Sequence, residues 1–142
     1  MIVNSAYMYM GKKEPEPPKT ELWTNGKLNY PFTITSGNAS FDSANNQLVL
    51  PASSSVIFSD IDLRTFETIT LEYATADTSF GKYSLQAILP NGTTIDLLKA
   101  TTNQIKGSDR KNIPATAKND IVKLKLDASI KSFNITNVSW SK

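Results

Sequence analysis

The sequence contains neither cysteine nor histidine among its 142 residues. The lack of cysteine excludes a disulfide framework and thioredoxin-type redox chemistry, and the lack of both residues excludes a zinc site built from Cys and His ligands. The absence of histidine also excludes Ser-His-Asp and Cys-His catalytic triads. Any enzyme chemistry would therefore depend on carboxylate, lysine, serine or tyrosine side chains.

Long hydrophobic runs are also missing. The apolar stretch at the start, residues 1–10 (MIVNSAYMYM), is far shorter than the roughly 20 residues of a membrane-spanning helix. No basic residue precedes it and no small-residue cleavage site follows it, so it does not have the features of a secretory signal. We therefore expect a protein that is made in a cytoplasm, is not secreted and does not insert into a membrane.

Charge of one sign is not in large excess. Fifteen Lys and Arg residues stand against 13 Asp and Glu residues, which gives a net charge of +2. Two of the fifteen are arginine, the residue best suited to reading phosphates and bases, so nucleic-acid binding is not expected. With 39% hydrophobic and 20% charged residues, the length and composition predict one globular domain.

The first 19 residues differ in composition from the rest. Apolar side chains dominate residues 1–10, and three prolines follow within the charged segment 12–19 (KKEPEPPK). Proline at this density favours a stiff polyproline II spacer. We hypothesise that this arm docks on a neighbouring subunit or a larger assembly, in which case the partner-contacting residues are Ile2, Val3, Tyr7, Met8, Tyr9 and Met10. The alternatives are that residues 1–10 return to their own domain as an edge strand, or that they fray.

The remainder of the chain, residues 20–142, is predicted to be one β-domain that follows an arm and Pro-rich spacer at 1–19. Short apolar runs at a period of two residues are separated by Gly, Asn, Asp, Ser and Pro, as in antiparallel strands with one buried and one solvated face. In one such run Ile69, Leu71 and Tyr73 would face the core. The pattern predicts eight strands, at 32–35, 47–50, 55–58, 68–74, 82–89, 94–99, 120–126 and 131–140.

Turn residues separate these runs. The pairs Asn25-Gly26, Asn45-Asn46 and Asn91-Gly92 suit positive φ, and the last pair, between two predicted strands, indicates a hairpin. A change of apolar phase within 131–140 predicts a bulge near Asn137. Residues 102–119 show the least periodicity and predict a long loop with at most one short strand.

This pattern of short strands without helical spacing predicts an all-β fold. We expect a single antiparallel two-sheet β-sandwich of jelly-roll-like type, with the N-terminal arm extending from it. The missing Cys…Trp…Cys spacing disfavours an immunoglobulin domain.

Four aspartates are the candidate metal ligands. Alternation would place Asp60 and Asp62 on one face, with Asp42 and Asp77 in other loops. Carboxylate oxygens of this kind could hold calcium, but aspartate in turns more often hydrogen-bonds its own backbone, and no calcium-loop motif is present. We therefore expect no metal and no cofactor. A hydrolase with two facing carboxylates is the weakest alternative, and we expect no enzyme activity and no catalytic residues.

Basic residues gather toward the C-terminus. Residues 99–142 carry nine Lys or Arg and three Asp, a net charge of +6, whereas residues 1–98 carry six against ten, a net charge of −4. This asymmetry would orient the domain on an acidic partner such as a neighbouring subunit or an anionic glycan. The alternative is an ordinary solvated lysine face that also protects an edge strand.

Aromatic side chains offer a possible sugar platform. Trp23, Tyr30, Phe80 and Trp140 are the candidates, since the apolar face of a sugar packs well on an aromatic plane. Phe58, Phe66, Tyr73 and Phe133 are expected in the core. Trp23 and Trp140 stand at the two ends of the predicted domain and are expected to pack together, so neither is expected to bind a ligand.

The layout resembles the small virion proteins of tailed bacteriophages, in its apolar start, its spacer at 12–19 and the segment 21–25 (ELWTN) that enters the domain. The domain is also similar to the galactose-binding-like or carbohydrate-module jelly roll, in 69–73 (ITLEY), in 83–89 leading into Asn91-Gly92, and in 133–140 (FNITNVSW). The first resemblance implies a non-enzymatic structural component of a bacteriophage particle, made in the bacterial host cytoplasm. It would be a head decoration or fibre protein, or a tail or baseplate accessory, a homo-oligomer with other virion proteins as partners. The alternative is a carbohydrate-binding module that recognises a host-surface glycan.

Overall fold

The computed structural model describes residues 19–142. The strands, in chain order, are β1 (Trp23–Thr24), β2 (Lys27–Leu28), β3 (Phe32–Ser36), β4 (Ser40–Asp42), β5 (Gln47–Leu50), β6 (Ser54–Ile61), β7 (Thr68–Ala74), β8 (Gly81–Ile88), β9 (Thr94–Thr102), β10 (Lys106–Asn112), β11 (Val122–Ser129) and β12 (Phe133–Ser141). A short 3₁₀ helix, η1 (Ala115–Lys118), precedes β11. No helix in this part of the chain has the length and apolar character needed to cross a membrane.

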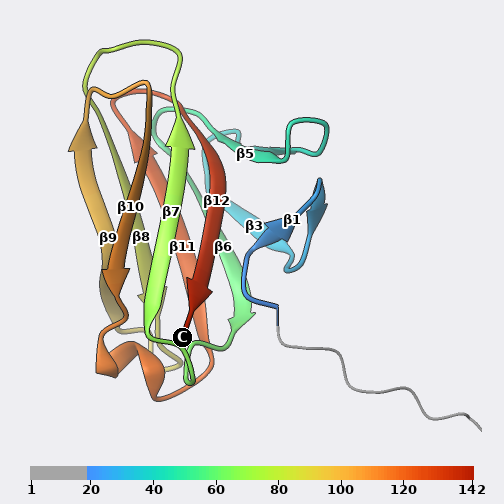
Figure 1. Ribbon diagram of the computed structural model, residues 1–142, viewed down its shortest axis with the longest axis vertical. Helices are drawn as coiled ribbons and strands as arrows, with labels where there is room; N and C mark the ends of the chain where they lie inside the picture. The colour runs from blue at the N-terminus through green and yellow to red at the C-terminus, as the bar shows by residue number, and fades with distance from the viewer. Residues whose placement is uncertain (1–18) are drawn as a thin grey trace, which may run out of the picture.

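Ten of these strands form two five-stranded antiparallel sheets that lie face to face (Figure 1). We call the sheet with strand order β10-β7-β12-β5-β4 the first sheet, and the sheet with order β3-β6-β11-β8-β9 the second sheet. The small hairpin β1-β2 lies beside them. This arrangement confirms the predicted all-β sandwich. Each of the eight predicted strands falls on an observed strand, with ends that differ by up to three residues.

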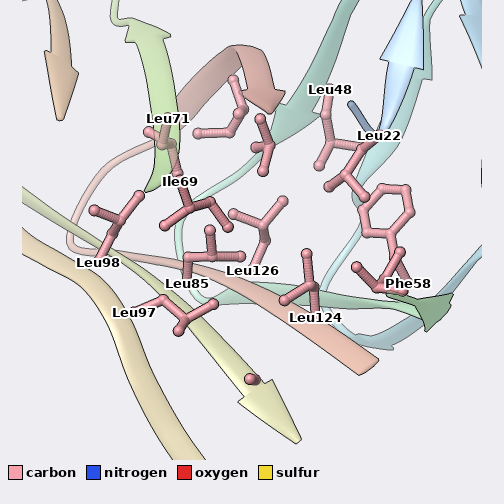
Figure 2. Close-up of a cluster of buried hydrophobic side chains, with 14 of the residues drawn as sticks. Leu22, Leu48, Phe58, Ile69, Leu71, Leu85, Leu97, Leu98, Leu124 and Leu126 are labelled. Atoms are coloured by element: carbon pink, nitrogen blue, oxygen red, sulfur yellow. The ribbon is translucent and has the colours of Figure 1, made fainter. Parts of the chain in front are cut away.

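The core lies between the sheets and is built from every second strand position. Ile69 and Leu71 of the first sheet, and Leu85, Leu124 and Leu126 of the second, are all fully buried in one cluster. Figure 2 shows these side chains pointing into a shared apolar space. Burial of each stabilises the fold by about 1.5–3 kcal/mol. The alternation therefore determines which face of each sheet is inside, and it leaves the opposite face for solvent or a ligand.

The predicted turns are present with three different geometries. Asn25 and Gly26 both have positive φ, 49° and 78°, as the two-residue type I′ hairpin between β1 and β2 requires. Gly92 has a φ of 89° between β8 and β9, where its N–H donates to the carbonyl of Leu89 at 2.8 Å. In the pair Asn45-Asn46, the second residue has the positive φ, 53°.

The predicted bulge in the last strand is confirmed. The pairing of β12 with β7 shifts register between Ile135 and Asn137, so Thr136 is the extra residue. Because of this insertion, Ile135 and Val138 are both buried although they are three residues apart.

The segment 102–119, predicted as a long loop with at most one short strand, contains one strand that is longer than expected. Residues 106–112 are β10, which pairs with β7 along its whole length, and η1 follows. β10 is an edge strand with the charged and largely exposed sequence KGSDRKN, so it has no apolar alternation to reveal it. Where it faces the core, Gly107 lies against the ring of Tyr73. The short strands β1, β2 and β4 were not predicted.

The two ends of the domain are neighbours, as expected. The N–H of Leu22 donates to the carbonyl of Val138 at 3.0 Å, and that of Trp140 donates to Thr20 at 2.8 Å. Trp23 packs on Phe41 and Phe58, whereas Trp140 packs on Tyr30. The expected contact between the two tryptophans is therefore absent from the ring contacts of residues 19–142.

Candidate functional site

A groove of about 530 Å³ lies on the outer face of the second sheet. All five strands of that sheet contribute to its lining, which comprises Ser36, Ser53, Ser54, Lys82, Tyr83, Ser84, Lys99, Ala100, Thr101, Asp127, Ala128 and Ser129. β6 and β8 begin at this end of the sheet, and β3, β9 and β11 finish there. The volume is within the range of about 300–1,000 Å³ that is typical of small-molecule sites.

The strand register aligns outward-facing polar side chains across this end of the sheet. Lys99 pairs with Ser84, Ser84 with Asp127, and Asp127 with Ser55. Ser55 in turn pairs with Ser36 on the edge strand β3. We call these five residues the polar row. Because side chains alternate between faces, the polar row lies on the face opposite the core.

Hydrogen bonds order the polar row. The hydroxyl of Ser84 donates to Asp127 Oδ2 at 3.2 Å, and the hydroxyls of Ser36 and Ser55 are 3.1 Å apart. Thr35 Oγ1 makes a further hydrogen bond to Ser55, which is only 5% exposed. A carboxylate accepts up to about four hydrogen bonds. Among the described residues, Ser84 is the side chain that donates to the Asp127 carboxylate. This carboxylate can therefore accept further hydrogen bonds from a ligand.

Lys131 holds the loop 75–80, which leads into β8 beside the groove. Its ammonium group donates to Thr75 Oγ1 at 3.3 Å and to the carbonyl oxygens of Asp77, at 2.9 Å, and Ser79. It also lies 3.6 Å from Asp77 Oδ1, and the side chain is 10% exposed. Hydrogen bonds from Ser79 and, to a lesser extent, the charge of Lys131 lower the pKa of the Asp77 carboxyl. One tethered cation thus organises this loop.

Three large apolar side chains are exposed at the same end of the sandwich. Phe80, 59% exposed, precedes β8; Ile105, 51% exposed, precedes β10; and Ile130, 63% exposed, follows β11. Ile130 has a φ of 75°, which is rare for a β-branched residue. Since Lys82 and Ser129 line the groove, Phe80 and Ile130 stand next to its lining in the chain. None of the three side chains lines the groove itself.

The four aromatic residues considered for a sugar platform do not form one exposed surface, although Tyr30 and Trp140 pack on each other. Trp23 and Trp140 are buried, at 2% and 3% exposure. Tyr30 is partly buried, and this burial, followed by the charge of Asp62, raises the pKa of its hydroxyl. Phe80 is the exposed member of the set, and it is not among the residues that line the groove. The core positions predicted for Phe58, Phe66, Tyr73 and Phe133 are confirmed.

Three of the four candidate metal ligands, Asp42, Asp62 and Asp77, accept hydrogen bonds from nearby residues. Asp62 accepts hydrogen bonds of 3.0 and 3.1 Å from the Arg64 guanidinium, and these bonds lower the pKa of its carboxyl. Asp60 has a φ of 65°, which interrupts the alternation expected to place it on one face with Asp62. Asp42 accepts from the backbone and side chain of Asn45, in the manner of a turn. No group of three or more acidic residues within 19–142 could hold a metal ion.

The basic C-terminal region is divided between the two sheets. Lys99, Lys123 and Lys125 lie on the outer face of the second sheet, where Lys82 from the first part of the chain joins them. The other basic residues are on β10, on η1, in the loop before β12 and at the end of the chain: Lys106, Arg110, Lys111, Lys118, Lys131 and Lys142. Of these four lysines, Lys82 and Lys99 line the groove, whereas Lys125 and Lys123 lie farther along the sheet, opposite Gln86 and Ile88.

The predicted partner-contacting residues lie outside the described residues, and so does the spacer up to residue 18. They are Ile2, Val3, Tyr7, Met8, Tyr9 and Met10. The boundary between arm and domain therefore stays a prediction.

The polar row was missed by sequence reasoning. Ser84 and Lys99 occupy the solvent-facing positions of predicted strands, and Asp127 follows another, so alternation alone could have assigned the first two to an outer face. What alternation does not supply is the order of strands in the sheet. That order brings Ser36 and Asp127 into one row although they are 91 positions apart in the sequence.

No protein-family model matches the sequence, and no curated protein matches it. Among solved structures, a family 6 carbohydrate-binding module is similar with a TM-score of 0.54 and 17% identity, covering 80% of this chain and 88% of its own. A module from Clostridium stercorarium, solved in complex with cellobiose, has a TM-score of 0.51 and 18% identity with the same coverage of 80% and 88%. A family 11 carbohydrate-binding module from Clostridium thermocellum, solved with a β-1,3-1,4-mixed-linked tetrasaccharide, has a TM-score of 0.51 and 12% identity, covering 86% and 94%. At these identities the likeness shows the fold: the chain has the jelly-roll β-sandwich found in carbohydrate-binding modules.

Proposed function

We propose that the chain is a carbohydrate-binding module that takes a glycan into the groove of the second sheet. The observation that carries this proposal is the polar row, in which hydroxyl, carboxylate and ammonium groups cross a groove of ligand size. Sugar hydroxyls both donate and accept hydrogen bonds, and the row offers partners of both kinds. The fold shared with carbohydrate-binding modules supports the same class of ligand.

The polar row suggests a role for each of its central members. Asp127 accepts hydrogen bonds from sugar hydroxyls, and Ser84 orients that carboxylate through its own hydrogen bond. Lys99 donates from the neighbouring strand β9. Because these groups project from the strands of a packed sandwich rather than from free loops, binding requires little reordering of the backbone.

The number of carboxylates in the groove favours binding without catalysis. Hydrolysis of a glycosidic bond by the usual route needs two carboxyl groups that flank the bond. Among the described residues that line the groove, Asp127 is the one that carries a carboxylate. We therefore assign the groove to recognition.

Binding of soluble polysaccharides by the full chain tests the proposal, with affinity electrophoresis as the screen and calorimetry for confirmation. Asp127→Ala removes a charged hydrogen-bond acceptor, so affinity should fall by about tenfold or more. Glu72→Ala is the matched control, because Glu72 is an exposed carboxylate on the outer face of the first sheet. Absence of binding to every polysaccharide, or an equal loss in the Glu72 variant, would contradict the proposal.

The virion role stays a prediction, together with the virion partners, the homo-oligomer and the particle location. It depends on residues 1–18, which lie outside the described part of the chain. A chain shortened by residues 1–19 is expected to keep glycan binding and to lose incorporation into its assembly. Normal incorporation of the shortened chain would contradict the docking role of the arm and would not affect the proposal for the groove.

A further inference from the structure

We infer that the groove selects acidic glycans, which carry carboxylate or sulfate groups, over neutral ones. This inference rests on the proposed function and names the ligand class of the same site. It is argued from the charges around the groove, from their spacing, and from the kind of side chains that line it.

The outer face of the second sheet carries an excess of positive charge. Its lysines are Lys82, Lys99, Lys123 and Lys125, and its aspartates are Asp96 and Asp127. The hydroxyl of Ser84 donates to one aspartate, and the amide of Gln86 donates to the other at 2.8 Å. None of these four lysines forms an ion pair with another described residue, so their charges are available to a ligand.

Two of the lysines lie in the groove itself and are close together. Lys82 pairs with Thr101 and Lys99 with Ser84, which makes the two lysines diagonal neighbours on β8 and β9. Such neighbours are about 7–8 Å apart in an antiparallel sheet. Long lysine side chains at this spacing can contact the same anionic group or two successive ones along a polymer.

The groove lacks the ring faces on which a neutral sugar would stack. Tyr83 is its aromatic lining residue, but the Tyr83 side chain is 3% exposed and its ring packs in the core on Tyr73 and Phe133. Affinity in the groove must therefore come from hydrogen bonds and charge. A polyanion gains from both, whereas a neutral glycan gains only from the first.

Nucleic acid is the other common polyanion, and the lining favours it less. The described residues that line the groove include neither arginine, which grips phosphates with two parallel hydrogen bonds, nor an exposed ring for base stacking. The lining places serine and threonine hydroxyls beside lysines. This combination suits an acidic glycan, which carries many hydroxyl groups and a negative charge on some of its sugars.

The test compares binding of the full chain to polygalacturonate and chondroitin sulfate with binding to mixed-linkage β-glucan and xylan. A single-stranded oligonucleotide serves as a further polyanion. The variant Lys82→Gln/Lys99→Gln removes the two charges of the groove. The matched control, Lys106→Gln/Lys111→Gln, removes two exposed charges from β10 in the other sheet.

We expect an acidic polysaccharide to bind at least about tenfold more tightly than the neutral ones. Binding should weaken as NaCl rises from about 50 to about 300 mM, and fall by about tenfold in the groove variant but not in the control. A neutral glycan could instead bind equally tightly, with an affinity that is unchanged in the Lys82/Lys99 variant and lost in Asp127→Ala. That result would overturn the selectivity for acidic glycans and preserve the proposed function. Failure of every polysaccharide to bind would remove the proposed function itself. An equal loss in the control variant, or tighter binding of the oligonucleotide through the same lysines, would also overturn the inference.

Discussion

Replacement of Lys131 by methionine should release the loop 75–80 while leaving the sandwich folded. Methionine keeps most of the length and apolar volume of the lysine side chain but removes its ammonium group. That group donates to oxygen atoms of Thr75, Asp77 and Ser79, and the Lys131 side chain is 10% exposed. Without it, Thr75 Oγ1 still donates to the carbonyl oxygens of Asp77 and Gln104, but the hydrogen bonds that join the loop to the segment before β12 are lost.

The size of the effect follows from the hydrogen bonds of Lys131. A hydrogen bond that involves a charged group stabilises the folded structure by about 1.5–3 kcal/mol. Because water can reach the loop oxygens, we expect about 2 kcal/mol in total for the substitution. This corresponds to about a 30-fold rise in the population of the open loop. If the free energy of unfolding of the whole domain fell by this amount, Tm would fall by roughly 5–8 °C.

Hydrogen–deuterium exchange of the full chain, read by mass spectrometry, measures this directly. Peptides that cover 75–80 should exchange about 30-fold faster in Lys131→Met, whereas those from β8 and β11 should be unchanged. Lys106→Met is the control, since this lysine is exposed on β10. Unchanged protection of 75–80 in the Lys131 variant would refute the tethering argument.

Three further predictions concern the core, the pH dependence of stability and the exposed ring of Phe80. Gly107→Ala would place Cβ 2.5 Å from Tyr73 Oη, so urea denaturation should show a loss of about 1–3 kcal/mol; an unchanged midpoint would contradict the close packing. Burial and, second, the charge of Asp109 raise the pKa of the Tyr83 hydroxyl, so the folded state holds this proton after an unfolded tyrosine has lost it. The stabilisation is thus fully present below about pH 10 and declines as pH rises above that value, and Asp109→Asn should make the decline shallower in urea titrations at stepped pH. Phe80→Ala should change stability by less than about 0.5 kcal/mol because the ring is exposed, and it should leave glycan affinity unchanged because Phe80 does not line the groove; a clear loss of affinity in a glycan titration would contradict the absence of ring stacking there.

The fold could be predicted where burial leaves a trace in the sequence. β7, β8 and β11 each bury one face, so their apolar alternation revealed both the strands and the inward residues. The phase change that revealed the bulge at Thr136 is of the same kind. β10 escaped because an edge strand buries little, and because a glycine occupies its contact with Tyr73. Its pairing with β7 depends on backbone hydrogen bonds, and the pattern of side chains in the sequence does not reveal these.

The candidate site was less predictable than the fold. Aromatic residues drew attention as sugar platforms, yet the sandwich buries both tryptophans, since large rings stabilise a core more than they serve a surface. The polar row consists of residues that look ordinary one at a time, such as Ser36, Ser84 and Asp127. Strand order unites them, and strand order is a long-range property of the whole chain.

Chemical-shift mapping on the ¹⁵N-labelled full chain tests the groove most directly, with oligosaccharides of galacturonate and of mixed-linkage glucan as parallel probes. If the groove binds glycan, the amide shifts that change should gather at the polar row and its neighbours on β8, β9 and β11. The change should disappear in Asp127→Ala. Shifts that gather instead on β7 and β12 of the first sheet, or no shifts with either probe, would contradict the account.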